Sequence, residues 1–314
     1  MQTYPVIAGP TATGKTALAV ALAQALHGEV VSADSMQVYD DVWVGTARPT
    51  PAEQQGIVHH LQGFLPLQEP YSVARYVEDA YRAFDAIYAQ EKTPVLCGGT
   101  GLYIQSFMEN IQFFPQPGDP RLRQELLQIG REQGGVVLLD RLSRVDPAAA
   151  ARLHENDLHR IVRALEVFQL TGETLTQQEQ RSHSVPPPYR GCLFVLKYRD
   201  RALLYQRIDE RVERMLEQGL VAEAGRVLQQ QPEATVLQAI GYKEFIPYFS
   251  GTCTLEQAVD TLKRETRRYA KRQMSWFRRM AYAQPIWLED YADLAALTQE
   301  VLARYQRFVA GGED

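Results

Sequence analysis

The sequence has few cysteines and no long apolar segment. Its three cysteines, Cys97, Cys192 and Cys253, are far apart and form no C-x-x-C pair, which argues against a disulfide framework and a zinc site. No uncharged apolar run reaches the roughly 18 to 20 residues that a membrane-spanning helix needs. The N-terminus lacks a basic segment followed by a long apolar core, so we expect no signal peptide. These absences predict a cytoplasmic protein with reduced thiols and no membrane partner.

The overall composition excludes further classes of protein. Hydrophobic residues make up 45% and charged residues 23% of the 314 residues, which is close to the average for globular chains. These proportions argue against a disordered chain, a fibre or a coiled coil. The length suits one large α/β domain with an insertion, or two modest domains.

A net charge of −5 hides a strong asymmetry along the chain. Residues 190–279 carry 17 basic and 11 acidic side chains, and the rest of the chain is strongly acidic. Within residues 263–279 there are eight basic side chains and one acid, Glu265. At helical spacing, Arg268 and Arg272 share one face and apolar residues share another. This pattern favours an RNA-binding helix over an ordinary solvated face.

Strands and helices are predicted to alternate along the first hundred residues. The predicted strands are residues 4–8, 29–32 and 94–97, followed much later by 193–197 and 286–288, and the first helices are 15–26 and 73–90. Such alternation predicts a parallel sheet with helical crossovers. Ligands bind at the carboxyl ends of the strands in such sheets. The loops after Ala8, Ser32 and Cys97 are therefore expected to share a ligand site.

The middle of the chain is mostly helical and is bordered by proline-rich segments at Pro115–Pro117 and Pro186–Pro188. We therefore expect an α/β core formed by residues 1–110 and 190–314, with a helical C-terminal region. Residues 111–189 are expected to form a mostly helical inserted subdomain.

The loop after the first strand matches the phosphate-binding pattern G-x-x-x-x-G-K-[ST]. It lies between a strand and a helix, where backbone N–H groups and the helix N-terminus can bind phosphate. Lys15 is expected to pair with phosphate charge, and the hydroxyl of Thr16 to bind Mg²⁺ as cofactor. The expected diphosphate-binding residues are Gly9, Pro10, Thr11, Ala12, Thr13, Gly14, Lys15 and Thr16. The α/β core is thus predicted to be P-loop NTPase-like.

Two further loop motifs accompany this P-loop. They are DSMQVY, which begins at Asp34, and GGTGLY, which begins at Gly98. P-loop kinases and ATPases usually place a magnesium-binding acid on a later strand, whereas Asp34 comes early. Taken alone, Asp34 could equally cap the segment that follows it.

With these motifs, the sequence resembles the bacterial tRNA dimethylallyltransferase family, also called tRNA isopentenyltransferases. The resemblance covers nearly the whole chain and includes GTARP at 45–49, HENDLHRIVRALEV at 154–167, LYQRIDERVERML at 204–216, AIGYKE at 239–244 and YAKRQMSWFRR at 269–279. It implies transfer of a dimethylallyl group from dimethylallyl diphosphate to N6 of the adenine 3′-adjacent to the anticodon in a subset of tRNAs, with release of diphosphate.

The resemblance also implies roles for individual residues. Asp34 is the expected general base, Thr100 is expected to hydrogen-bond near Asp34 and the target base, and Arg211 to clamp the diphosphate. On its own, Arg211 would belong with Arg207 to a solvated helix face. The residues expected to contact tRNA are Asp34, Ser35, Met36, Gln37, Thr100, Arg123, His159, Arg160, Ile161, Val162, Arg163, Gln238, Gly241, Tyr242, Lys243, Lys271, Arg272 and Arg278.

We expect the adenine to leave its stack and enter a channel between core and insert, because a stacked base is unreachable. The insert is expected to close over the anticodon stem-loop of the tRNA, and the protein to act as a monomer.

Three other functions remain open on the residues alone. A P-loop kinase of a small metabolite would use ATP and need no RNA. An adenylate isopentenyltransferase would share the chemistry but act on a free nucleotide, without need of the insert or the basic helix. A non-enzymatic RNA-binding protein would carry a vestigial P-loop, against which the intact Lys15, Thr16 and Asp34 argue.

Overall fold

A computed structural model describes residues 1–113 and 118–311, so the predicted joint at Pro115–Pro117 lies outside the described residues. The chain divides into two compact units. The core unit comprises Met1–Met108 and Pro187–Asp314, and the helical unit comprises Glu109–Pro186. These boundaries lie within about three residues of those expected from the sequence.

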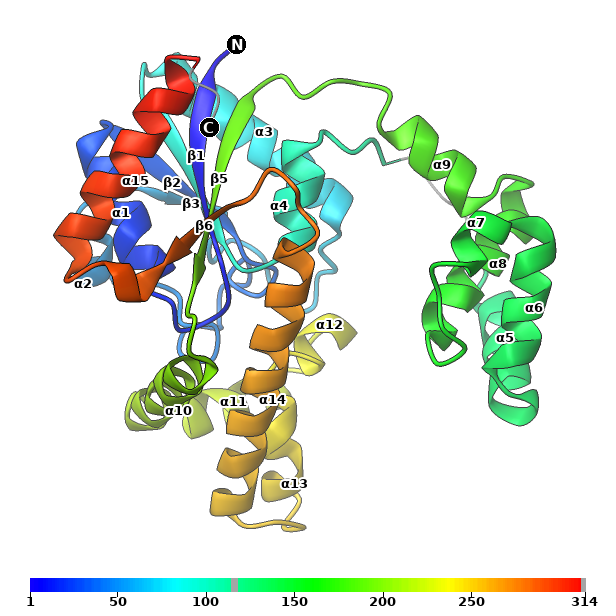
Figure 1. The fold of residues 1–314 in the computed structure, drawn as a ribbon. Helices are drawn as coiled ribbons and strands as arrows, with labels where there is room; N and C mark the ends of the chain where they lie inside the picture. Colours follow the sequence, from blue (N-terminus) through cyan, green and yellow to red (C-terminus); the bar gives the residue numbers. More distant parts are fainter. Residues whose placement is uncertain (114–117, 312–314) are drawn as a thin grey trace. The chain divides into compact units, whose positions relative to one another are not determined.

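The core unit contains a parallel six-stranded sheet in the order β3-β2-β4-β1-β5-β6 (Figure 1). The strands are β1 Thr3–Ala8, β2 Gly28–Ala33, β3 His59–His60, β4 Thr93–Gly98, β5 Arg190–Lys197 and β6 Gln284–Trp287. Gly98 at the end of β4 pairs with Ala8 of β1 and with Ala33 of β2. Three neighbouring strands therefore end level with one another, and the three motif-bearing loops begin at the same edge. The parallel α/β sheet predicted from the sequence is confirmed.

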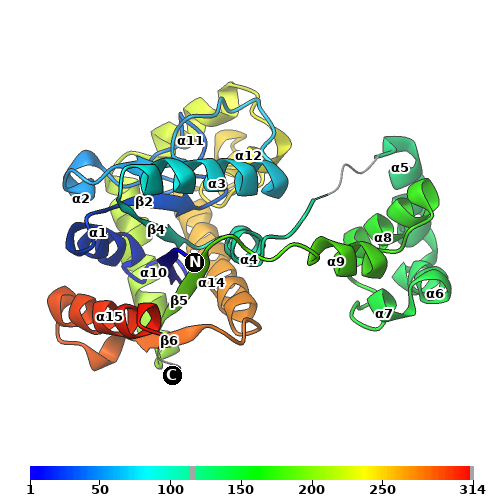
Figure 2. The same cartoon turned by 90° about the horizontal axis from the view of Figure 1, so that it is seen from above.

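Helices cover both faces of this sheet (Figure 2). Tyr4, Val6 and Ala8 of β1 pack toward α3 and α4, whereas Ile7 packs toward α1 and α15. This alternation follows from the two-residue period of a strand. The helices are α1 Lys15–Ala25, α3 Val73–Ala89, α4 Gly101–Met108 and α15 Leu294–Val309, with the short α2 at Pro51–Gln54.

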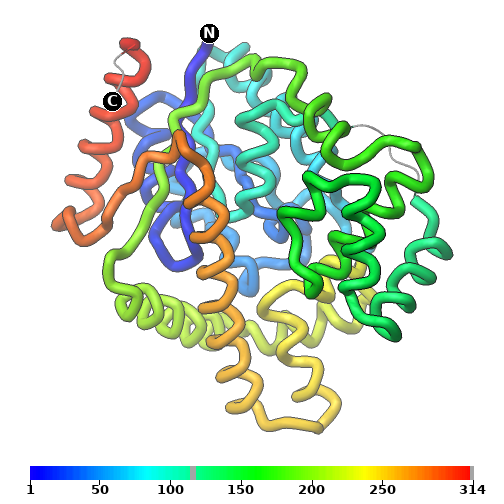
Figure 3. The backbone as a smooth tube through the Cα atoms, turned by 45° about the vertical axis from the view of Figure 1, so that its right-hand side comes forward, coloured from blue at the N-terminus to red at the C-terminus, as the bar shows by residue number. Residues whose placement is uncertain are grey.

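Further helices lie beyond the carboxyl ends of the strands (Figures 1 and 3). They are α10 Arg201–Glu217, α11 Leu220–Gln229, α12 Ala234–Leu237, α13 Ile246–Phe249 and α14 Leu255–Phe277, with a 3-10 turn at Lys243–Phe245. Helix α14 begins with a capping box formed by Thr254 and Gln257. Leu262 and Thr266 of α14 are buried while Arg268 and Arg272 are exposed. The predicted division into a packed and a basic face is confirmed.

Every regular element described in the helical unit is a helix. These are α5 Pro120–Gln133, α6 Gly135–Val145, α7 Pro147–Ala150, α8 Leu158–Thr171 and α9 Leu175–Ser182. Leu126, Leu138, Leu142, Ile161 and Leu165 form the centre of its own small core. Throughout the described ranges, we find no helix with the length and apolarity that a membrane crossing requires.

Candidate active site

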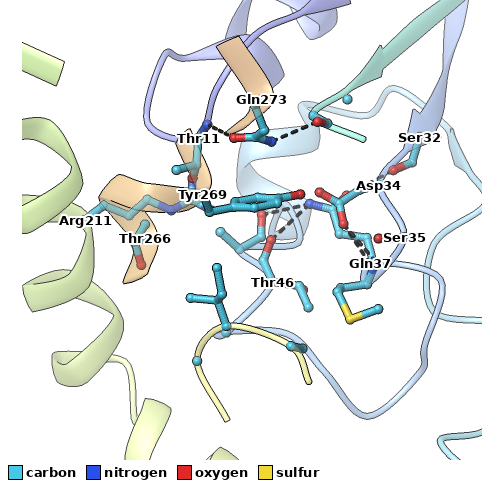
Figure 4. A pocket seen from close by; sticks show the side chains of 18 of the residues that line it. Thr11, Ser32, Asp34, Ser35, Gln37, Thr46, Arg211, Thr266, Tyr269 and Gln273 are labelled. Atoms are coloured by element: carbon cyan, nitrogen blue, oxygen red, sulfur yellow. Dashed lines mark hydrogen bonds between the residues drawn. The ribbon is translucent and has the colours of Figure 1, made fainter. Parts of the chain in front are cut away.

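A cavity of about 370 Å³ lies at the carboxyl edge of the sheet (Figure 4). Its walls come from the P-loop, the loop after β2, helices α10 and α14, and the segment 235–243, all within the core unit. The predicted site residues that line it are Thr11, Lys15, Thr16, Asp34, Ser35, Met36, Gln37, Arg211, Gln238, Gly241, Lys243 and Arg272. The fold thus brings phosphate-binding, acidic and RNA-contacting candidates to one cavity.

The P-loop, Gly9–Thr16, has a shape fixed largely by its own contacts. The hydroxyl of Thr13 and the ammonium of Lys15 both donate to the Pro10 carbonyl, at 2.8 and 2.7 Å. Gly9 has a φ of 147°, and a Cβ there would lie 2.8 Å from the Leu196 carbonyl oxygen. A side chain at this position would therefore clash with β5, which accounts for the glycine.

Four cationic side chains line the cavity, Lys15, Arg211, Lys243 and Arg272, and burial shifts the pKa of the first two. Burial lowers the pKa of Lys15 to about 8, and burial also lowers the pKa of Arg211. The Asp34 carboxylate acts in the opposite direction on both groups, so its charge is felt at each. Within the described ranges, neither Lys15 nor Arg211 forms an ion pair. The cavity therefore holds positive charge that an anionic group such as a diphosphate would stabilise.

Asp34 directly follows β2 and stabilises a turn with one of its two oxygens. Its Oδ1 accepts hydrogen bonds from the backbone N–H groups of Met36, at 2.9 Å, and Gln37, at 3.4 Å. The segment is a turn and not an α-helix, so Asp34 acts as a cap, but not as a helix cap. No hydrogen bond to Oδ2 is found in the part of the chain that is described. The second oxygen can therefore serve a different purpose.

Thr100 lies beside the Asp34 turn and not in the cavity wall. Its Oγ1 accepts a hydrogen bond from the backbone N–H of Ser35 at 3.0 Å. Thr100 also opposes the rise that burial and the Asp34 charge cause in the pKa of Tyr269, a residue of α14 that points toward Asp34 (Figure 4). Thr100 thus helps to fix the Asp34 turn, and its contact with a target base stays a prediction.

Gln37 is already engaged within the protein. Its amide nitrogen donates to the carbonyls of Thr46, at 3.2 Å, and Ala47, at 3.4 Å. Its amide oxygen accepts from the Ser32 hydroxyl, at 3.1 Å, and from the Gln62 amide, at 3.0 Å. These bonds hold the GTARP segment against the cavity, so Gln37 has a structural role whether or not it also touches RNA.

Tyr242 corrects one prediction of an RNA contact. Its side chain is buried, and its hydroxyl donates to Glu223 of α11 at 2.9 Å. Glu223 also accepts the backbone N–H groups of three consecutive residues, Trp43, Val44 and Gly45. Tyr242 therefore supports the loop that precedes Arg48 and has no exposed surface for RNA. Nothing in the sequence marked Glu223 for this role.

The predicted RNA-contacting residues of α8 and its surroundings fall into three groups. His159 and Arg160 are exposed, as an RNA contact requires. Arg123 and Arg163 form ion pairs with the fully buried Glu166, at 2.9 and 3.0 Å, while retaining partly exposed side chains. The prediction is not supported for Ile161 and Val162, because both side chains are buried in the helical core. In an amphipathic helix, exposed residues such as His159 and Arg160 alternate with residues such as Ile161 and Val162 that face the apolar core.

The basic candidates of α14 and its C-terminal end are exposed: Lys271, Arg272 and Arg278. Arg272 lines the main cavity and also a surface depression formed by Arg268, Lys271, Ser275, Trp276 and Arg279. It therefore joins the basic surface to the cavity.

Two cavity residues of α14 were missed as site residues, Tyr269 and Gln273. Their side chains face the loops after β1, β2 and β4 (Figure 4). In the sequence, Tyr269 falls at helical spacing on the apolar face of α14, and Gln273 is one uncharged residue in a basic run. The helical period could have placed Gln273 on the buried face with Thr266, but not against the P-loop.

The cavity offers few protein ligands for a magnesium ion, which suits an ion bound mainly by the diphosphate and water. In the described residues, no cluster of three or more His, Cys, Asp or Glu side chains could hold a metal ion. Thr16 lines the cavity next to Lys15 and offers a hydroxyl oxygen. Mg²⁺ commonly takes few protein oxygens and completes its shell with water and phosphate oxygens. The donor set fits Mg²⁺ bound together with a diphosphate.

Comparison with known proteins identifies a family. The IPP transferase family profile matches residues 37–280, and an isopentenyl transferase profile matches residues 1–62. A tRNA dimethylallyltransferase of Carboxydothermus hydrogenoformans is 46% identical over 275 residues, which are 87% of this chain and 88% of that protein.

Two solved structures share the fold. A full-length tRNA isopentenylpyrophosphate transferase from Bacillus halodurans is 38% identical with a TM-score of 0.72, covering 99% of this chain and 97% of that one. A eukaryotic dimethylallyltransferase, captured in crystallographic snapshots acting on tRNA, is 28% identical with a TM-score of 0.82, covering 100% and 81%. The chain belongs to the IPP transferase family, the family of the tRNA dimethylallyltransferases.

Proposed function

We propose that this protein transfers a dimethylallyl group from dimethylallyl diphosphate to N6 of the adenine on the 3′ side of the anticodon in a subset of tRNAs. One observation carries the proposal: a single cavity combines a cationic P-loop, the carboxylate of Asp34 and Arg272, which also lines a depression on the basic face of α14. Membership of the IPP transferase family supports it over a small-metabolite kinase.

The cationic end of the cavity binds and stabilises the diphosphate. Lys15, Thr16 and Arg211 line the space where it would lie. In the transfer, the bond between C1 of the prenyl group and oxygen breaks, and its electron pair leaves with diphosphate. The negative charge on the leaving group grows as this bond lengthens, so fixed cations lower the barrier.

Asp34 accepts the proton that N6 loses. The new bond forms between N6 and C1 of the prenyl group, and the N6 proton moves to Oδ2 of Asp34. The Oδ1 atom stays in its turn, which keeps the carboxylate oriented throughout. A carboxylate would bind diphosphate poorly because the two anions repel, so a role toward the incoming amine suits Asp34 better.

The RNA approaches along α14. The exposed Arg268, Lys271 and Arg279 surround a depression that Arg272 connects to the cavity. Basic side chains on one face suit the phosphates of an anticodon stem-loop. The cavity then receives an extruded adenine, since a stacked base cannot reach Asp34.

A bound Mg²⁺, held on the protein side by Thr16, would supply positive charge to the departing diphosphate. Thr16 lies at the N-terminal turn of α1, next to Lys15. A monomeric state and a location in the cytoplasm, where tRNA is found, stay predictions.

The proposal is tested with the purified protein, Mg²⁺ and dimethylallyl diphosphate. Three reactions are run in parallel, one with unmodified tRNA, one with AMP and one with both tRNA and ATP. Prenylated adenine is then sought by mass spectrometry. We expect prenylated tRNA, no prenylated AMP and no ATP consumption. Prenylated AMP alone would support the adenylate isopentenyltransferase, stoichiometric ATP consumption the kinase, and RNA binding without product the non-enzymatic protein.

A further inference from the structure

Gln273 connects two loops of the active site through one side-chain amide. It lies on the buried face of α14 and is 6% exposed. Its Oε1 accepts the backbone N–H of Thr11 at 3.0 Å, and its Nε2 donates to the carbonyl of Gly99 at 2.9 Å (Figure 4). Thr11 belongs to the P-loop and Gly99 to the loop after β4. The amide therefore spans the ends of two neighbouring strands.

The contact depends on the absence of a side chain at residue 99. A Cβ on Gly99 would lie 2.3 Å from Nε2 of Gln273. Trp276 lies one turn of α14 after Gln273, and a Cβ on Gly101 would lie 2.4 Å from its Cδ1 atom. The two glycines of the GGTG loop thus let α14 approach closely at two points, and the helix packs directly against the loop after β4 and the P-loop.

The same turns of α14 carry the basic surface. Arg272 immediately precedes Gln273, and Lys271 and Ser275 are exposed beside it. A helix is a stiff element, so a ligand that fixes its exposed face also restrains its buried face. Gln273 is where that restraint reaches the P-loop.

We propose that Gln273 is a positioning residue that couples RNA binding on the outer face of α14 to diphosphate binding in the P-loop. The inference rests on the proposed function, since it assumes that RNA binds on α14. By holding the N–H of Thr11, Gln273 fixes the start of the loop and leaves the later N–H groups to face the ligand. RNA that immobilises α14 then pre-orders the loop, and diphosphate binds more tightly.

The coupling is measured as the ratio of two dissociation constants. Binding of inorganic diphosphate with Mg²⁺ is followed by calorimetry, with and without a saturating unmodified anticodon stem-loop. For the wild type, we expect the stem-loop to tighten diphosphate binding about five-fold or more, a typical allosteric coupling. For Gln273→Met, which keeps the length of the side chain but neither donor nor acceptor, we expect a ratio near one. The affinity for RNA alone should stay within about two-fold.

Two further variants separate this role from general packing. Gly99→Ala leaves Gln273 in place but displaces its amide, so we expect the same loss of coupling. Phe277→Leu reduces a buried apolar side chain of α14 that packs in the core of the sheet and does not line the cavity, and should retain the coupling. Thermal unfolding of each variant identifies any that fail to fold, and Gly99→Ala decides the question if Gln273→Met does not fold.

The outcomes separate the two proposals. Any of three results overturns the role of Gln273. They are a wild-type ratio near one, a wild-type ratio in folded Gln273→Met or Gly99→Ala, and a loss of coupling in Phe277→Leu as large as that in Gln273→Met. None of these results touches prenyl transfer, which is measured separately. Failure of the wild type to bind the stem-loop would contradict the proposed function itself and, with it, the coupling.

Discussion

At the scale of one residue, Lys15 shows how the fold holds a buried ammonium group ready to bind an anion. Burial lowers its pKa from the ordinary 10.5 to about 8, so near pH 7 the free protein keeps a mostly protonated but poorly solvated ammonium group. Its hydrogen bond to the Pro10 carbonyl is a weak substitute for an anion. A diphosphate supplies the missing charge, and binding should therefore raise the pKa again.

This linkage predicts a pH dependence of diphosphate binding. As the pH rises through about 8, Lys15 loses its proton in the free protein, and binding must then be accompanied by proton uptake. We expect the dissociation constant of inorganic diphosphate to increase about ten-fold between pH 7 and pH 9. The same titration with Lys15→Ala reports the ligand's own ionisation and serves as the control. Identical pH profiles for both proteins would contradict the assignment of Lys15.

In the proposed mechanism, Asp34 is the general base of the chemical step. Asp34→Asn keeps an Oδ1 that can accept the N–H groups of Met36 and Gln37, so the turn should survive. It cannot accept a proton, and we expect kcat to fall by roughly 10² to 10⁴ while both substrates bind within a few-fold of the wild type. Asp34→Ala, which also loses the turn, should be at least as impaired. Single-turnover transfer by Asp34→Asn at the wild-type rate would return Asp34 to a purely structural role.

At this scale the sequence could identify only residues whose chemistry is carried by a local pattern. Lys15 and Asp34 follow strands in short motifs, and both line the cavity. Gln273, Glu223 and Tyr242 make their decisive contacts with residues far away in the chain, and those partners are set only by the packing of α11 and α14. Arg211 was expected at the site only through the family resemblance, because its i,i+4 relation to the exposed Arg207 gave no sign that it faces a cavity.

At the scale of elements, apolar runs predicted five of the six strands. The exception, β3, is two residues long and consists of His59 and His60. It is the edge strand of the sheet and pairs with β2 at only two positions, Val30 with His59 and Val31 with His60. So short an edge strand does not require an apolar run. Its order in the sheet is a tertiary property that a local pattern cannot contain.

Helix α14 gives a prediction of its own. Lys271→Gln with Arg278→Gln removes two exposed cations. If both contact phosphates, the plot of log affinity for tRNA against log salt should become less steep by about 0.7 to 0.9 per lost contact. Affinity for diphosphate without RNA should stay nearly unchanged. The matched control is Arg82→Gln on α3, an exposed arginine paired with Asp79. An unchanged slope in the double variant would make this an ordinary solvated face.

The whole molecule combines a rigid sheet with a separately folded helical unit. The core unit alone supplies every residue that lines the cavity. The helical unit has its own apolar centre and a fully buried Glu166 held by Arg123 and Arg163, so its exposed His159 and Arg160 are presented by an independently packed body. This division suits a protein whose substrate is much larger than its catalytic cavity.

Closure of the helical unit over RNA is the prediction that belongs to this scale. The chain passes between the two units near residues 109 and 186, and the second of these segments contains Pro186–Pro188. We expect the distance between labels at Arg82→Cys on α3 and Arg144→Cys on α6, both exposed, to change when an anticodon stem-loop binds. Of the native cysteines, the partly exposed Cys97 and Cys253 would be replaced by serine, and the buried Cys192 would be kept. The distribution of distances between the two labels is measured spectroscopically with and without RNA. If both units bind the stem-loop, we expect this distribution to shift and to become narrower. Superimposable distributions at saturating RNA would show that the units do not reorient, and the RNA would then have to fit the arrangement that the free protein already has.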